Sequence, residues 1–94
     1  MAPLTEREAA EIGDRALAFL AVEPARLVAF LQATGMAPST LRAQSDAPAT
    51  LAAVLRYLLE DESLLLVFAT EAAIAPDRIA PAAALLARDA AAPR

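Results

Sequence analysis

Carboxylates at helical spacing are the first residues of this sequence whose types could do chemistry. Glu8, Glu11 and Asp14 are three residues apart, so they share one face of a helix. Paired carboxylates act as general acid and base when they are buried and coupled. Arg7 and Arg15 lie beside them, however, and alternating acids and arginines are typical of a solvated, ion-paired face. We therefore expect a charged surface at these residues and no catalytic pair.

A second acidic group, Glu60-Asp61-Glu62, has the residue types that bind a divalent cation. Such a cation needs several oxygen atoms that converge from a shaped loop, usually one with glycine. Three consecutive residues at the start of a helix point in different directions. We interpret the group as a helix N-cap with favourable negative charge at the positive end of the helix dipole. No metal site and no cofactor are expected.

Nucleophilic catalysis lacks its activating groups in this sequence. The chain has three serines and five threonines but no histidine, lysine or cysteine, and all eight basic residues are arginine. Histidine and lysine are the usual bases that activate a serine or threonine hydroxyl. No serine is flanked by glycines, and two glycines cannot build a phosphate-binding loop. We therefore expect no enzyme activity, and the residues indicate no small-molecule substrate.

Residues 27–44 resemble a helix-turn-helix DNA reader, with an apolar helix, a turn at Gly35 and a second helix rich in serine and threonine. The second helix of that motif enters the major groove with its N-terminal residues. Ser39, Thr40 and Arg42 are therefore the candidate DNA contacts. A net charge of −4 and a pI of about 4.6 oppose the binding of phosphates. A DNA-binding regulator is the alternative function, and nucleic acid is not the expected partner.

The elements that position these residues are predicted to be helices throughout. The hydrophobic fraction is 59%, largely alanine and leucine, whereas aromatic residues make up 4%. A chain of 94 residues suffices for one domain, which we expect to be a compact all-α bundle of five or six short helices over residues 1–94. The expected helices cover about 5–22, 24–34, 38–44, 47–59, 62–73 and 81–88, with a frayed tail over 90–94.

Three local signals support these boundaries. Thr5 and Glu8 have the spacing of a capping box at the start of the first helix. Gly35 is suited to the left-handed conformation that ends a helix. Pro81 is expected to open the last helix, because a proline inside a helix costs about 3 kcal/mol.

The chain also resembles itself at an offset of 38 residues. The segment Leu17-Ala18-Phe19-Leu20 matches Leu55-Arg56-Tyr57-Leu58, and Phe30 matches Phe68. Met36-Ala37-Pro38 likewise matches Ile74-Ala75-Pro76. We predict two related halves, about 5–44 and 47–89, which pack into one pseudo-symmetric bundle.

The segment Leu64-Leu65-Leu66-Val67-Phe68 is apolar on every side of its helix. Such a helix is either the buried centre of the fold or partly a partner surface. In the second case one edge, formed by Leu64 and Val67 or by Leu66, reaches the surface. That edge would give a homodimer or accept a helix of a protein partner. We therefore favour a noncatalytic protein-interaction or structural module, with Leu64, Leu66 and Val67 as candidate contacts.

The hydropathy pattern predicts no membrane protein. The run of strongly apolar residues at 64–69 is far shorter than the ~20 residues that cross a bilayer. The first residues include acidic side chains, which a secretory signal or a transit peptide avoids. We expect a cytoplasmic protein.

Residues 16–20, 24–42 and 51–69 together resemble a small bacterial family of uncharacterised function. The most specific parts of the match are the Thr34-Gly35 turn and the Asp61-Glu62 corner. The resemblance covers most of the chain and implies a compact helical domain without an assigned activity. It implies no catalytic residues.

Overall fold

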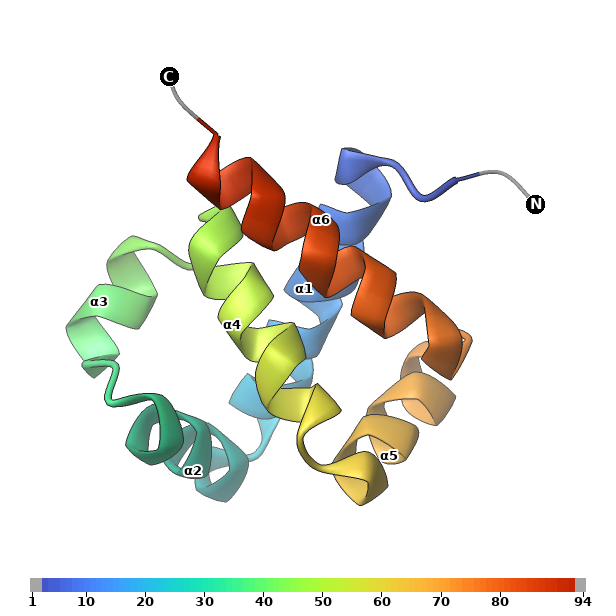
Figure 1. The fold of residues 1–94 in the computed structure, drawn as a ribbon. Helices are drawn as coiled ribbons and strands as arrows, with labels where there is room; N and C mark the ends of the chain where they lie inside the picture. Colours follow the sequence, from blue (N-terminus) through green and yellow to red (C-terminus); the bar gives the residue numbers. More distant parts are fainter. Residues whose placement is uncertain (1–2, 93–94) are drawn as a thin grey trace.

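Six α-helices and one short 3₁₀ helix form the fold in the computed structural model, which describes residues 3–92 (Figure 1). No strand occurs in that range, so the all-α bundle and its helix number are confirmed. The helices are α1 (Glu6–Val22), α2 (Pro24–Thr34), α3 (Pro38–Ala43), α4 (Pro48–Leu59), α5 (Glu62–Ala72), the 3₁₀ helix η1 (Pro76–Arg78) and α6 (Ile79–Ala91).

The centre of the fold consists of α1, α4 and α6, which pack on one another. The pair α2 and α3 lies on one side of this core and α5 on the other (Figure 1). Helix α4 is the most enclosed of the three, because six of its 12 residues are buried, against six of 17 in α1 and four of 13 in α6. The buried residues of α4 are Thr50, Leu51, Ala52, Val54, Leu55 and Leu58. Gly13 lets α1 approach α4 closely, because a Cβ atom there would lie 2.8 Å from Leu51 Cβ. The buried central helix is therefore α4.

The helix ends follow the local signals in the sequence. The Thr5 N–H donates to Glu8 Oε1 at 2.9 Å, and the Glu8 N–H donates to Thr5 Oγ1 at 3.1 Å. This reciprocal pair satisfies two backbone donors that a helix start leaves free, so the capping box is confirmed. Asp61 caps α5 in a similar way, since its Oδ1 accepts from the Leu64 N–H at 3.1 Å. The cap interpretation of the second acidic group is therefore correct for Asp61.

The start of α6 corrects the expectation for Pro81. The helix begins at Ile79, directly after η1, and runs to Ala91 rather than Arg88. Pro81 is thus the third residue of α6, where a backbone N–H has no partner inside the helix. The missing N–H costs no helical hydrogen bond there. Residues 90–91 of the expected frayed tail are helical, and 93–94 lie outside the described residues.

One pair of helices from the two halves of the chain starts at the offset of the predicted repeat. Helices α2 and α5 each have 11 residues and start 38 residues apart. Each is followed by a residue in the left-handed region, Gly35 with φ 73° and Ala73 with φ 57°. A common origin of the two halves stays a prediction, but their helices correspond residue by residue in this region.

The Cα radius of gyration is 12.5 Å, close to the ~12 Å expected for a compact chain of this length. Within residues 3–92, no single helix is long and apolar enough to cross a membrane. Helices α1 and α2 pass that test only as a pair, by length and composition, and they are bent by 115° at their junction.

Candidate functional site

The apolar helix α5 is partly exposed. Leu66 and Val67 are 45% and 41% exposed, Leu64 is half-buried, and Phe68 is only 1% exposed. Of the two interpretations of this segment, the wholly buried central helix is therefore wrong. An apolar edge reaches the surface, as the other interpretation requires. The contact role of Leu64, Leu66 and Val67 stays a prediction.

The exposed residues of α5 are regularly spaced along one side of the helix. Ser63, Leu66, Val67 and Thr70 are all exposed and follow the i, i+3, i+4, i+7 spacing of one helical stripe. We call these four residues the outer seam of α5. At 100° per residue, the exposed Glu62 and Glu71 lie on opposite flanks of this stripe. The seam is thus uncharged along its length and has one carboxylate on each flank.

A groove of about 290 Å³ lies between α1 and α5, on the Glu71 flank of the outer seam. Its floor is formed by Phe19 and Phe68, whose ring centroids are 5.4 Å apart. Val22 stands at its edge with 75% of its surface exposed. The residues that line this α1–α5 groove are Arg15, Ala18, Phe19, Val22, Phe68, Glu71 and Ala72.

Arg15 lines the α1–α5 groove and Arg26 contacts the Phe19 ring, and both guanidinium groups have a partner within the fold. Arg15 Nη1 donates to the Ala72 carbonyl oxygen at 3.2 Å, at the end of α5. The Arg26 guanidinium lies over the Phe19 ring, 4.2 Å from its centroid, in a cation–π contact. These two contacts fix the long side chains beside the groove.

The other half of the chain contains a counterpart groove between α4 and α2. It has a volume of about 200 Å³, and its lining residues include Tyr57, which corresponds to Phe19 at the 38-residue offset. The Tyr57 ring packs on Phe30 at a centroid distance of 5.4 Å, as Phe19 packs on Phe68. The lining of the counterpart consists of Ala33, Thr34, Ala53, Arg56, Tyr57 and Glu60.

The two grooves differ in chemistry at corresponding positions. Ala18 in the α1–α5 groove corresponds to Arg56 in the counterpart, and Val22 corresponds to Glu60. Charged side chains are therefore compatible with this position of the fold, as the counterpart shows. The α1–α5 groove has its own charged residues at other positions, since Arg15 and Glu71 correspond to Ala53 and Ala33 of the counterpart. The exposed apolar side chain of Val22 on α1 is therefore not a requirement of the helix packing. The candidate contacts predicted from the sequence did not include Ala18 and Val22. The 38-residue alignment nevertheless pairs these two residues with the charged Arg56 and Glu60.

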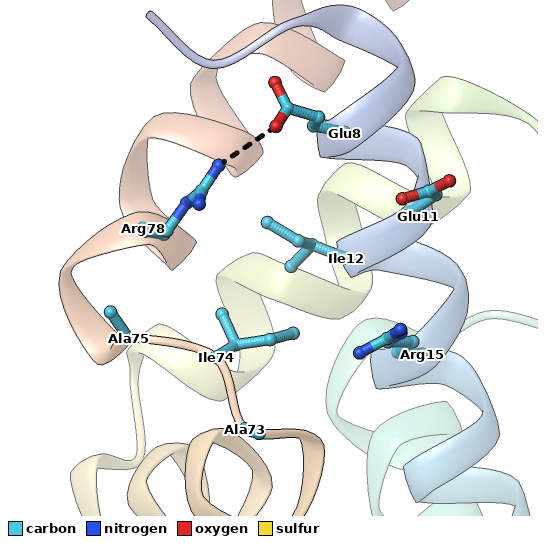
Figure 2. A pocket seen from close by; sticks show the side chains of 8 residues that line it. All are labelled: Glu8, Glu11, Ile12, Arg15, Ala73, Ile74, Ala75 and Arg78. Carbon is cyan, nitrogen blue, oxygen red and sulfur yellow. Dashed lines mark hydrogen bonds and ion pairs between the residues drawn. The ribbon is translucent and has the colours of Figure 1, made fainter. Parts of the chain in front are cut away.

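A third cavity, of about 270 Å³, lies between the first half of α1 and the segment that joins α5 to η1 (Figure 2). Glu8 and Arg78 face each other across it and form an ion pair with 3.4 Å between Oε2 and Nη2. The Thr5 N–H that donates to Glu8 holds the pKa of that carboxyl below its ordinary value of 4.5, and the Thr5 hydroxyl and Arg78 act in the same direction. Glu11 and Arg15 also line the cavity.

The residues that line this third cavity connect α1 to η1 and to the end of α5. It brings together Glu8 and Glu11 of the carboxylate face, whereas Asp14 is not among its lining residues. Its ion pair joins α1 to η1, and the Arg15 hydrogen bond joins α1 to the end of α5. Its lining has no serine, threonine or cysteine nucleophile. We interpret it as a polar junction between the two halves.

The candidate DNA contacts lie on the surface. Ser39, Thr40 and Arg42 are exposed on α3, a helix of six residues. Arg42 is the one cation of that helix, and Asp46 follows in the next loop. This arrangement offers little positive charge for phosphates and does not favour the DNA-binding alternative. Over residues 3–92, no group of three acidic, histidine or cysteine residues is placed to hold a metal ion.

The fold and its surfaces define a small all-α domain whose most distinctive feature is an exposed apolar surface on one helix. Residues 6–89 match the family described as Protein of unknown function (DUF3572). Because this match covers most of the chain, the protein belongs to that family. The comparisons find no matching curated protein and no matching solved structure.

Proposed function

We propose that this protein is a noncatalytic protein-interaction module. Its contact surface comprises the outer seam of α5 and the adjoining α1–α5 groove. The observation that supports this role is the exposure of Leu66 and Val67, side by side on a helix of a small domain. Exposed apolar patches with polar edges are typical of protein-binding surfaces.

The shape of this surface favours a helix as the bound element. The outer seam has the i, i+3, i+4, i+7 spacing at which side chains of a second helix pack between those of the first. On the α1 side of the groove, Val22 adds a further exposed apolar side chain. The bound helix would shield three of the five large hydrophobic residues that the structure leaves exposed over residues 3–92.

The counterpart groove supports a specific role for the surface beside α5. At the positions of Ala18 and Val22 the counterpart has Arg56 and Glu60, whereas the charged residues of the α1–α5 groove, Arg15 and Glu71, lie at other positions. Val28 of α2 corresponds to Leu66 and is 50% exposed, but its neighbour Ala29 replaces the second large apolar residue, Val67. Val28 therefore provides a control position of similar exposure in the same local fold.

The experiment that tests this role compares Leu66→Glu with Val28→Glu. Each tagged protein is expressed in the cells that produce it, and co-purified proteins are quantified against the unchanged chain. We expect Leu66→Glu to remove at least one specific co-purified protein that Val28→Glu retains. If both variants retain the same proteins as the unchanged chain, the outer seam is not the contact surface.

The acidic, cysteine-free sequence supports a cytoplasmic location for this interaction. The alternative, DNA binding through α3, has no structural observation in its favour.

A further inference from the structure

We infer that the bound element is a basic amphipathic helix of another protein, whose lysines or arginines lie opposite Glu62 and Glu71. This inference rests on the proposed function and specifies the chemistry of its partner. The exposed apolar residues of the seam indicate a helix as the partner, and the carboxylates on its flanks indicate the charge of that helix.

The charge on α5 is of one sign. Its N-cap and its helical residues include Asp61, Glu62 and Glu71, and no residue of α5 is basic. Within residues 3–92 the structure has one ion pair, Glu8 with Arg78, so neither Glu62 nor Glu71 is paired. Arg15, which lines the groove, donates to the Ala72 carbonyl, and Arg26 lies over the Phe19 ring. The seam is therefore an uncharged stripe between two carboxylates that have no ion-pair partner among the described residues.

A second copy of the chain fits this surface poorly. A two-fold pair of α5 helices would bring the acidic flanks of both copies around one seam, with no cation on either α5. Like charges across an interface oppose association, and the net charge of −4 adds to that repulsion. A basic amphipathic helix would instead pack its apolar stripe on the outer seam and place a cation near each of the two carboxylates.

The positions of the carboxylates also define a spacing in the partner. Glu62 and Glu71 are nine residues apart, which is about 13.5 Å along the helix axis. The partner helix should therefore have apolar residues at i, i+3 or i+4, and i+7. Its lysines or arginines should flank this stripe about two and a half turns apart.

The test is a selection of helical peptides by the full chain. The peptides have 18 residues, fixed leucines on one stripe and randomised residues on both flanks, and they are selected at low salt. We expect enrichment of lysine and arginine on the flanks. We also expect the best selected peptide to bind Glu62→Gln/Glu71→Gln about 5-fold more weakly, the effect of losing two exposed ion pairs.

The matched control is Asp46→Asn/Asp89→Asn, which changes the net charge equally at exposed positions outside α5. This control should leave the affinity of that peptide within a factor of two. An equal loss in both double variants would mean that only the net charge attracts the peptide and would overturn the inference.

Other outcomes separate this inference from the proposed function. Enrichment of neutral or acidic flanks, or no enrichment at all, overturns the basic partner, whereas the Leu66→Glu comparison still decides the interaction role. A dimer mass in sedimentation equilibrium that Leu66→Glu abolishes would replace the basic helix by a second copy. If Leu66→Glu has no effect on co-purified proteins either, both proposals fail.

Discussion

The ring of Phe19 in α1 packs on the ring of Phe68 in α5, with centroids 5.4 Å apart and planes inclined by 56°. Their counterparts at the 38-residue offset, Tyr57 and Phe30, are also 5.4 Å apart. In each pair, one ring comes from the first half of the chain and the other from the second half. Each peripheral helix, α5 or α2, is thus anchored to a core helix of the other half by one aromatic contact.

Removal of the Phe68 ring should destabilise the whole fold. Phe68 is 1% exposed, and a Phe→Ala change in a core costs about 3–5 kcal/mol. Val67→Ala, next to it on the exposed side of α5, should cost less than about 1 kcal/mol. Urea unfolding followed by circular dichroism measures both. Similar losses for the two variants would show that α5 is not anchored through Phe68.

The two left-handed residues should respond to substitution in opposite directions. Gly35 has φ 73° and Ala73 has φ 57°, a region that costs residues with a Cβ about 1–2 kcal/mol. Gly35→Ala should therefore lower the free energy of unfolding by about 1 kcal/mol. Ala73→Gly should raise it by about 0.5 kcal/mol, because the greater flexibility of unfolded glycine offsets part of the gain. Thermal unfolding of the two variants checks this, and a loss of stability in Ala73→Gly would contradict it.

Gly13→Ala tests the close approach of α1 and α4. Alanine favours a helix over glycine by about 1 kcal/mol. The new Cβ, however, would lie 2.8 Å from Leu51 Cβ and 3.3 Å from Leu86 Cδ1, so the helices must separate. Overpacking of this kind costs about 1–3 kcal/mol. We expect a net loss of about 1 kcal/mol in urea unfolding, and a more stable variant would show that no close contact exists.

Glu8 should contribute a pH-dependent part of the stability. The pKa of its carboxyl is held below 4.5 in the fold by the Thr5 N–H, with the Thr5 hydroxyl and Arg78 in support. A lowered pKa means that the stabilisation is present above pH 4.5 and is lost as the pH falls through the folded value. An NMR titration of the Glu8 side chain should give a midpoint below 4.5, which Thr5→Ala moves upward. A midpoint at or above 4.5 in the unchanged chain would contradict the capping geometry.

The helices of this fold could be predicted because their signals are local. The Thr5–Glu8 capping box and the Gly35 stop involve residues within one turn of each other. The start of α6 could not be predicted from Pro81 alone, since it depends on the 3₁₀ turn that precedes the helix. The all-α class and the family of unknown function were likewise accessible from the sequence.

The candidate site was only partly predictable. The apolar residues 64–68 indicated a helix that is either buried or a contact surface. Which of the two holds depends on the helix that the remaining helices surround, and that helix is α4. The α1–α5 groove unites residues of α1 and α5 that are about 50 positions apart, such as Phe19 and Phe68. No local pattern reveals such a groove, although the internal alignment marked Ala18 as different from Arg56. The 38-residue duplication, the cytoplasmic location and the absence of catalysis stay predictions.

The most direct test of the account is site-specific photo-crosslinking in the cells that produce the protein. A photoreactive amino acid is placed at Leu66 in one variant and at Val28 in another, two positions of similar exposure on corresponding helices. We expect a discrete cross-link from position 66 to another polypeptide, mapped to a basic amphipathic segment, and none from position 28. Cross-links of equal yield from both positions, or none from position 66, would contradict it.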